Sequence, residues 1–400
     1  MDPIYMDHHA TTPVDSRVLD AMMPYLTHEF GNASSRTHPW GWHAEEAVDK
    51  ARQQVAAALN CRPDEVIFTG GATESNNLAV KGVAAAYRDR GKNHIVTTKI
   101  EHSAVMQPCQ TLETQGFTVT YLDVDRYGIV DPDEVRAAIT DETALISVIW
   151  AHNEIGTIQP VAEVGRIAKE AGVLFHTDGV QAFAKYDSDV ETLGVDLMAL
   201  SAHKIYGPKG VGALYVRKRR PRIRLAAQIE GGGQERKLRS GTLNVPGIVG
   251  LGEAVELYGE CRDEERSRVE ALRDRLHEAL RDGVEYVHLN GHPTERLYNN
   301  LNVSFEFVES ESLLMTLRDI ALSSGSACTS ASLESSSALL ATGLDESLAH
   351  SAVRFGLGRA NTTEQVDAVA TAVIDAVARQ RELSPLYEMK RQGVDVMASE

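Results

Sequence analysis

One lysine of the chain stands where an amine can be made nucleophilic. Lys204 follows the apolar run Val195–Leu200 and precedes the glycine-rich turn Tyr206–Gly210. A lysine at the end of a strand, where the chain enters a tight turn, can be desolvated, and a deprotonated amine forms a Schiff base with an aldehyde. Taken alone, such a lysine is more often an ordinary surface residue.

A carboxylate ends a neighbouring apolar run. Asp178 follows Val173–Thr177, and a carboxylate there can keep a pyridine nitrogen protonated, so that the ring withdraws electrons. Asp178 and Lys204 end two neighbouring predicted strands, so both side chains can converge on one crevice. The pair is more specific than either residue, because Asp178 alone is equally a cap or turn residue.

Two junctions between a predicted strand and a helix offer further groups for such a crevice. The turn Gly70–Glu74 presents backbone amides and a hydroxyl at a helix amino terminus, which suits a phosphate monoester. It matches neither a Walker loop nor the Gly-x-Gly-x-x-Gly fingerprint. His102 can stack on a flat ring and move protons. Each feature also has a plain structural reading, as a glycine-rich turn and as a capping or packed histidine.

A cysteine and an arginine in the carboxyl-terminal part complete the set. Cys328 lies within Ser323–Ser332, among small residues without apolar partners, where an exposed nucleophile would stand. Arg354 has a planar fork able to bind a carboxylate through two hydrogen bonds, or to form a surface ion pair. The other cysteines lie in or beside predicted helices and are interpreted as structural: Cys61, Cys109 and Cys261.

The elements that must position these residues alternate regularly. From about residue 16 to residue 216, segments of helical periodicity alternate with short apolar runs. This order predicts βαβ crossovers and a mainly parallel sheet covered on both faces, with ligands at the carboxyl ends of the strands. The strands expected are 66–68, 94–98, 119–122, 144–150, 173–177 and 195–200.

A long charged helix at about 250–280 leads into a smaller α+β unit. That unit is expected to contain strands near 301–305 and 353–357, and helices at 312–320 and 363–379. We therefore predict a large domain, residues 15–257, and a small domain formed by residues 1–14 and 258–400. The small domain carries the cysteine loop at about 323–337.

The composition excludes several classes of protein. A formal net charge of −17 over 400 residues disfavours a broad nucleic-acid-binding surface, and the basic run 217–224 is interpreted as a solvated turn. No apolar stretch is long enough to cross a bilayer and no signal peptide is recognised, so we expect a cytoplasmic protein. The scattered cysteines contain no Cys-x-x-Cys pair, and we expect no metal site.

Several motifs, taken together, point to one family. They are Ser201–Gly210, Gly71–Asn77, Glu101–His102, Asn153–Gly156, Arg239–Thr242 and Ser323–Cys328. With these motifs, the chain resembles the pyridoxal-phosphate-dependent cysteine desulfurases over nearly its whole length, and its long cysteine-bearing loop resembles the housekeeping type of iron–sulfur assembly. The resemblance implies a fold-type I enzyme of the class V aminotransferase superfamily, with a mainly parallel seven-stranded sheet flanked by helices and a smaller α+β domain.

The resemblance implies a role for each matching residue. Lys204 would form the Schiff base with pyridoxal 5'-phosphate, Asp178 would pair with the pyridinium nitrogen, and Gln181 would contact the ring hydroxyl. His102 would stack on the ring, and it joins Lys204 and Cys328 as a catalytic residue. Asn153 and Arg354 would hold the substrate carboxylate. The remaining implied cofactor contacts are Ala72, Thr73, Asn153, Ser201 and His203, with Thr242 supplied by the neighbouring subunit of a homodimer.

The implied reaction converts L-cysteine to L-alanine, with the sulfur held as a persulfide on Cys328 and passed to an acceptor protein. Iron–sulfur assembly, tRNA thiolation and DNA phosphorothioation all remain open as destinations. A selenocysteine lyase or another class V enzyme is the nearest alternative. A sulfur carrier without catalysis would not need Lys204, Asp178 and Arg354 together, and a metal hydrolase built on the adjacent His8 and His9 is least favoured.

Three positions depart from the usual pattern of the family. Gly179-Val180 separates Asp178 from Gln181 where alanine commonly follows the aspartate, His152 stands where asparagine is frequent, and Glu334–Ser337 lacks a proline. These departures leave the chemistry intact, but they bear on which acceptor protein the cysteine loop recognises.

Overall fold

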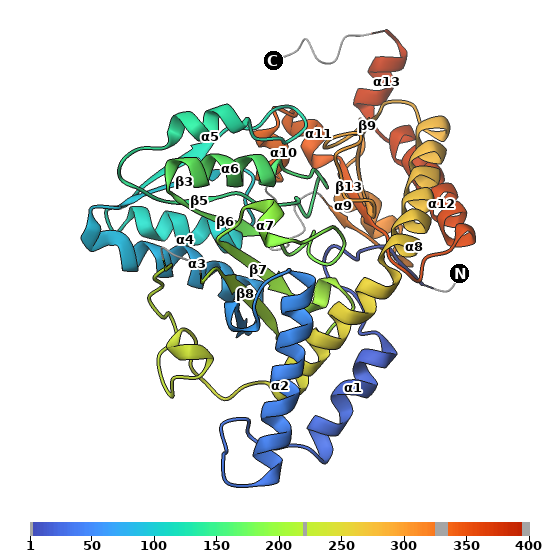
Figure 1. Ribbon diagram of the computed structural model, residues 1–400. Helices are drawn as coiled ribbons and strands as arrows, with labels where there is room; N and C mark the ends of the chain where they lie inside the picture. The colour runs from blue at the N-terminus through green and yellow to red at the C-terminus, as the bar shows by residue number, and fades with distance from the viewer. Residues whose placement is uncertain (1–2, 219–221, 325–334, 394–400) are drawn as a thin grey trace.

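The computed structural model describes residues 3–218, 222–324 and 335–393. A seven-stranded sheet with the order β2-β8-β7-β6-β5-β3-β4 forms its centre (Figure 1). Six strands run in one direction and only β8 is antiparallel to its neighbours, which confirms the mainly parallel sheet. The strands are β2 (Val66–Thr69), β3 (His94–Thr98), β4 (Thr118–Leu122), β5 (Thr143–Ser147), β6 (Leu174–Asp178), β7 (Leu197–Ser201) and β8 (Gly212–Val216).

Helices cover both faces of this sheet, so its central strands are apolar along their length instead of alternating. The helices between the strands are α3 (Ala72–Tyr87), α4 (Ser103–Glu113), α5 (Pro132–Ala138), α6 (Val161–Ala171) and α7 (Val190–Leu193). They follow the predicted βαβ order. No helix of the described ranges combines the length and the apolar character needed to cross a membrane.

The long helix α8 (Val245–Gly283) packs against two different sets of helices (Figure 1). Its first half lies against α1 (Ser16–Thr27) and α2 (Pro39–Ala58), and its second half lies against α12 (Thr363–Glu382). Leu251 and Val255 belong to the hydrophobic cluster under the large sheet, whereas Leu272 and Leu276 belong to a separate cluster. We propose that this change of partners within α8 marks the boundary at residue 257.

A four-stranded antiparallel sheet, with the order β12-β13-β10-β9, carries the second cluster. Its strands are β12 (Ser323–Ser324), β13 (Ala352–Gly356), β10 (Asn300–Phe305) and β9 (Val287–Leu289). The remaining helices here are α9 (Ser310–Thr316), α10 (Ser337–Ala341), α11 (Glu346–His350) and α13 (Pro385–Arg391).

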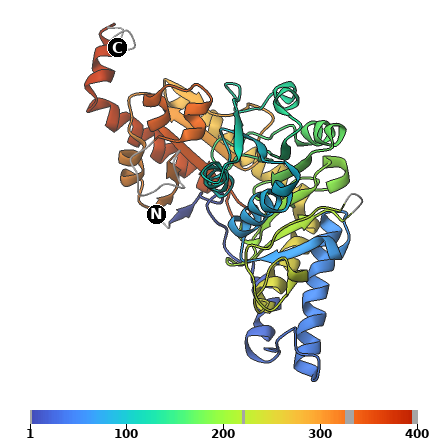
Figure 2. The ribbon, with the colours of Figure 1, turned by 90° about the vertical axis from the view of Figure 1, so that its left-hand side faces the viewer.

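Two predicted elements extend well past the ends that the structure gives them. The helix expected at 312–320 ends at Thr316, because Ile320–Ala321 forms strand β11, which pairs in parallel with β1 (Ile4–Tyr5). Figure 2 shows this amino-terminal strand beside the carboxyl-terminal part of the chain. The strand expected at 144–150 ends at Ser147, although the backbone of Trp150 still donates to Asp178 O at 3.0 Å.

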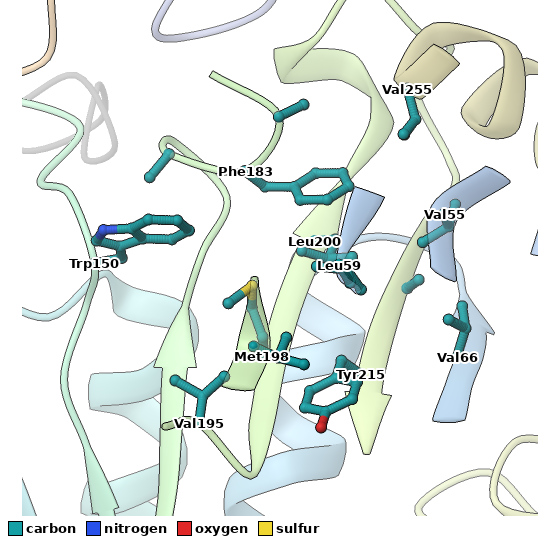
Figure 3. Packing of buried hydrophobic residues seen from close by; sticks show 14 of the residues in the cluster. Val55, Leu59, Val66, Trp150, Phe183, Val195, Met198, Leu200, Tyr215 and Val255 are labelled. Carbon is teal, nitrogen blue, oxygen red and sulfur yellow. The ribbon is translucent and has the colours of Figure 1, made fainter. Parts of the chain in front are cut away.

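Large apolar side chains fill the space beneath the sheet (Figure 3). Phe183, Leu200 and Tyr215 are each no more than 1% exposed, and α2 contributes Val55 to the same cluster. Close packing of this kind keeps the backbone above it in one arrangement. The carboxyl ends of the strands therefore rest on a rigid layer.

A buried ion pair fastens the segment before Arg239 to the sheet. Arg52 of α2 donates to both carboxylate oxygens of Glu235, at 2.6 and 2.8 Å, and Glu235 also accepts the backbone N–H of Phe68 at 2.8 Å. We predict that Arg52→Ala lowers the free energy of unfolding by about 3–5 kcal/mol, because the Glu235 carboxylate would stay buried without its partner. Urea or thermal unfolding measures the change.

The matched control is Arg62→Ala, which removes a pair with Asp64 whose side chains are 61% and 44% exposed. Solvent already screens that pair, so the unfolding curve should stay nearly unchanged. Equal effects of the two substitutions would show that burial of the Glu235 carboxylate is not what makes Arg52 important.

Candidate active site

A cavity of about 1010 Å³ opens at the carboxyl ends of the central strands, where the parallel sheet was expected to place its ligands. Its wall also includes a segment from the amino terminus, His9–Thr11, which the sequence had not assigned to this cavity. The lining contains most of the residues chosen from the sequence: Ala72, Thr73, His102, Asn153, Asp178, Gln181, Ser201, His203, Lys204 and Arg354.

Asp178 and Lys204 meet at this cavity because their strands are neighbours. Asp178 is the last residue of β6, and Lys204 ends a short 3₁₀ turn, Ala202–Lys204, that directly follows β7. The two strands pair in parallel, with Asp178 opposite Ala199. Lys204 Nζ donates to the carbonyl oxygens of His9 and Ala10, the latter at 2.7 Å.

The Asp178 carboxylate is fixed by two protein donors. Asn76 Nδ2 donates to one oxygen at 2.7 Å, and the backbone N–H of Val180 donates to the other at 3.1 Å. Asp178 is only 4% exposed and Asn76 is fully buried. Sequence reasoning missed Asn76. Its signal was an asparagine on the apolar face of α3, among Leu78, Ala79 and Val83, where a buried amide needs a polar partner.

His102 both caps a helix and faces the cavity, so the structural interpretation as a capping residue and the functional interpretation as a site residue are compatible. It is the N-cap of α4, and its Nδ1 accepts the backbone N–H of Ala104 at 3.1 Å. Burial is the main cause that lowers its pKa; Asp178 acts in the opposite direction and Lys204 in the same one. A neutral ring whose Nδ1 accepts carries its proton on Nε2.

The turn before α3 forms a concave surface of backbone groups. Gly71 has a φ of 147°, a backbone conformation that favours glycine, and Ala72 and Thr73 begin the helix. Ser201 and His203 face the same cavity from the end of β7. Burial, and to a smaller extent the charges of Lys204, Lys209 and Lys185, together lower the pKa of His203 to about 4. The imidazole is therefore neutral in positively charged surroundings, which suits an anion.

Gln181 is held by a residue of the amino-terminal segment. Its Nε2 donates to His9 O at 3.0 Å, and its Oε1 lies 3.0 Å from His9 Nδ1. His9 Nε2 lies 3.2 Å from Asn299 O, so this histidine connects the cavity to the chain just before β10. Among the described residues, no cluster of histidine, cysteine and acidic side chains could hold a metal ion.

Arg354 of β13 closes the cavity on the side of the small sheet. It is 1% exposed; Nη1 donates to Asn153 O at 3.0 Å, and Nη2 donates to Asp7 Oδ1 at 2.8 Å and to Ser323 Oγ at 3.1 Å. Its buried Nε has no hydrogen-bond partner in the part of the chain that the structure describes. An arginine in the wall of a ligand cavity is suited to bind a carboxylate.

One predicted site residue among those that the structure describes is not brought to this cavity. Thr242 is exposed and does not line the cavity of its own chain. Cys328 lies outside the described residues. The segment that contains Cys328 begins beside the site, because Ser323 contacts Arg354, and Ser336 after it donates to the Glu154 carboxylate.

The donor set of the cavity fits pyridoxal 5'-phosphate. An immobilised carboxylate, an amine and an imidazole surround one space, as a pyridinium nitrogen, an aldehyde and a flat ring require. The glycine turn at the start of α3, near Ser201 and His203, offers N–H and hydroxyl groups for a phosphate monoester.

Comparison with known proteins agrees with this chemistry. The family model for class V aminotransferases matches residues 4–369. Cysteine desulfurase IscS from Anaeromyxobacter sp. (strain Fw109-5) is 56% identical over 98% of this chain and 97% of its own length. The cysteine desulfurase of Mus musculus is 53% identical over 98% of this chain and 85% of its own.

Solved structures show the same similarity. A NifS-like protein superposes with a TM-score of 0.87 at 38% identity, covering 94% of this chain and all (100%) of its own. DndA from Streptomyces lividans superposes with a TM-score of 0.77 at 38% identity, covering 87% of this chain and 98% of its own. The chain therefore belongs to the class V aminotransferase family and, within it, to the pyridoxal-phosphate-dependent cysteine desulfurases.

Proposed function

We propose that the cavity around Lys204 converts L-cysteine to L-alanine, and that Cys328 takes up the sulfur as a persulfide. The convergence of Lys204 and Asp178 at the ends of adjacent strands carries this proposal. Purified protein supplied with pyridoxal 5'-phosphate should release one alanine for each sulfur recovered from L-cysteine. Absence of alanine would contradict it.

Pyridoxal 5'-phosphate, when bound, supplies an electron sink for the carbon atoms of an amino acid. Asp178, held by Asn76 and Val180, keeps its carboxylate fixed beside the ring nitrogen. His102, which lines the cavity, would stack on the cofactor ring. The phosphate would be held by Ala72, Thr73, Ser201 and His203, and Gln181 would contact the ring hydroxyl.

Lys204 has two tasks in this proposal. Its amine would hold the cofactor, and in its free form the same amine would take the proton from the substrate Cα. The carbonyl oxygens of His9 and Ala10, which accept from Lys204 Nζ, offer the free ammonium group a place within the cavity.

Arg354 and Asn153 bind the substrate carboxylate. Arg354 already has its two Nη groups fixed by Asn153, Asp7 and Ser323, so its orientation is set before substrate arrives. A guanidinium that is held in place loses little entropy on binding a carboxylate. The fork therefore orients the substrate Cα toward Lys204.

We predict that Arg354→Lys raises KM for L-cysteine by about 10- to 100-fold with a smaller change in kcat, because the ammonium group cannot reproduce hydrogen bonds from a planar fork to a carboxylate. Alanine formation at varied L-cysteine concentrations measures both constants. The matched control is Arg296→Lys, a second arginine that is only 5% exposed and binds main-chain carbonyl oxygens away from the cavity. An unchanged KM in Arg354→Lys would contradict the assignment.

The sulfur step is a displacement on sulfur. The Cys328 thiolate attacks the sulfur of the bound substrate, an S–S bond forms and the Cβ–S bond breaks. The electron pair of that bond stays with Cβ, which takes up a proton, and Cα regains the proton that Lys204 had taken, so that the product leaves as alanine. A later attack by an acceptor thiol on the outer sulfur of the persulfide regenerates Cys328.

Three further parts of the proposal concern the setting of the reaction. We expect a homodimer in which Thr242 reaches the phosphate of the other subunit, which agrees with its exposed position away from its own cavity.

We expect a cytoplasmic location, because the described cysteines are all free thiols and a catalytic thiol needs a reducing compartment. The acceptor is a sulfur-carrying protein, for iron–sulfur assembly or for tRNA or DNA modification.

A selenocysteine lyase is the second candidate, since the same cavity would bind selenocysteine. Turnover of L-cysteine and L-selenocysteine by the same preparation separates the two. A cysteine desulfurase should lose its activity toward L-cysteine when Cys328 is replaced, whereas a lyase specific for selenocysteine should show little activity toward L-cysteine at the outset.

A further inference from the structure

The loops that carry His102 and Asn153 are joined by a buried carboxyl group. Glu101 Oε1 accepts from the hydroxyl of Thr98 at 2.8 Å and from the backbone N–H of Ile149 at 2.8 Å. Thr98 ends β3 and Ile149 follows β5, and these two strands are neighbours. The Glu101 side chain therefore connects the ends of two strands directly beside His102.

A buried imidazole makes a second link between the same loops. His152 Nδ1 lies 3.2 Å from the backbone N–H of Glu154 and 3.3 Å from that of Ile155, and the ring also hydrogen-bonds to the backbone of Ile100. Burial lowers the pKa of His152 to about 3, so the ring is neutral at physiological pH. Nδ1 accepts, and the proton on Nε2 is donated to the Ile100 carbonyl.

We propose that Glu101 and His152 are positioning residues for His102. Together they clamp residues 100–102 onto residues 149–155 and so fix the imidazole of His102 in the cavity wall. The inference deepens the proposed function, on which it rests. The cavity is lined by His102, Ile149 and Asn153. Neither Glu101 nor His152 belongs to the described residues that line it. The two residues therefore act through the loops that they join.

Glu101 makes its links as a neutral acid. Burial is the largest cause that raises its pKa, to about 8, and Asp178 raises it as well, while its hydrogen bonds lower it. Its Oε2 is buried and has no hydrogen-bond partner among the described residues. Cys109 of α4 also lies near enough for Glu101 to raise the pKa of that thiol. Glutamine has the shape and charge of this neutral acid, so Glu101→Gln should retain both links.

Binding of pyridoxal 5'-phosphate to apo protein, followed by absorbance, tests the clamp. Glu101→Ala and His152→Ala should each raise the dissociation constant about tenfold, because each removes hydrogen bonds that fix His102. Glu101→Gln should bind as the unaltered protein does. On a His102→Ala background, Glu101→Ala should cause no further weakening, since the clamp would have no ring left to position.

The matched control is Glu65→Ala. Glu65 is also a buried carboxyl, 5% exposed, that accepts two backbone N–H groups, from Arg62 at 2.9 Å and Lys218 at 2.7 Å. It should lower the midpoint of thermal unfolding without changing cofactor affinity. If Glu101→Ala does not fold, Thr98→Val removes one of the two links and should show the same non-additivity with a smaller effect.

Additive effects of Glu101→Ala and His102→Ala on cofactor affinity, or a Glu101→Ala protein that binds normally, would overturn the clamp. Additivity of Thr98→Val and His102→Ala would do the same. The proposed function fails on a different observation, namely unaltered protein that binds pyridoxal 5'-phosphate but makes no alanine from L-cysteine.

Discussion

Replacing Lys204 by alanine is expected to abolish the visible absorption of the bound cofactor and to reduce alanine formation by about 10²- to 10⁴-fold or more. The variant loses both the amine that holds the cofactor and the base that moves the Cα proton. Absorption spectra and alanine assays on dialysed protein measure the two losses separately. Because Lys204 is partly exposed at a cavity wall, its removal should leave the unfolding midpoint close to that of the unaltered protein.

The sharpest control for this prediction is another lysine. Lys185 is 2% exposed, and burial lowers its pKa to about 7, with a further contribution from Lys204. Its Nζ has no hydrogen-bond partner among the described residues. By pKa alone it is a good candidate for a nucleophilic amine, yet it does not line the described cavity.

Lys185→Met should therefore keep the cofactor absorption and the turnover, because an unbranched apolar side chain of similar length fills a buried site. If Lys185→Met lost the absorption while Lys204→Ala kept it, the nucleophile would be Lys185 and the reading of the cavity would be wrong.

The parts of the site that could be predicted are those fixed by local sequence. Asp178 and Lys204 each follow a short apolar run. A polar residue at the end of a buried strand lies at the carboxyl end of the sheet, where ligands bind. The glycine turn before α3 was found in the same way, from two adjacent glycines between a predicted strand and a helix, and in the structure Gly71 has a conformation that favours glycine. In each case a few neighbouring residues contain the signal.

The parts that were missed depend on contacts between distant segments. His9 and Ala10 reach Lys204 across 195 and 194 positions of sequence, and their own types carry no signal because the contacts use main-chain oxygens. Asn76 contacts Asp178 across 102 positions.

The wrong end of the helix predicted at 312–320 has the same origin. Ile320 and Ala321 leave the helical pattern because they pair with Ile4 and Tyr5, at the other end of the chain. Local propensity cannot reveal a partner that lies more than 300 residues away.

Thiol chemistry separates the described cysteines from Cys328. Burial raises the pKa of Cys61 and of Cys109 to about 12 in each case, and it raises the pKa of Cys261. Since the thiolate is the nucleophile, these three thiols are poorly suited to attack sulfur at neutral pH. None of them lines the cavity that the described residues form. We therefore propose Cys328 as the nucleophile; Ser323, at the start of its sequence motif, contacts Arg354.

Cys328→Ser is therefore expected to keep the cofactor absorption and its change on adding L-cysteine, but to lose alanine formation by at least about 10²-fold, because a hydroxyl is a far weaker nucleophile than a thiolate. Spectra recorded with and without L-cysteine report substrate binding, and alanine and persulfide assays report the sulfur step. Cys61→Ser serves as the control and should retain full turnover. A Cys328→Ser protein that still made alanine at the normal rate would mean that a thiol other than Cys328, on the protein or in solution, attacks the substrate sulfur, and the persulfide would then not form on Cys328.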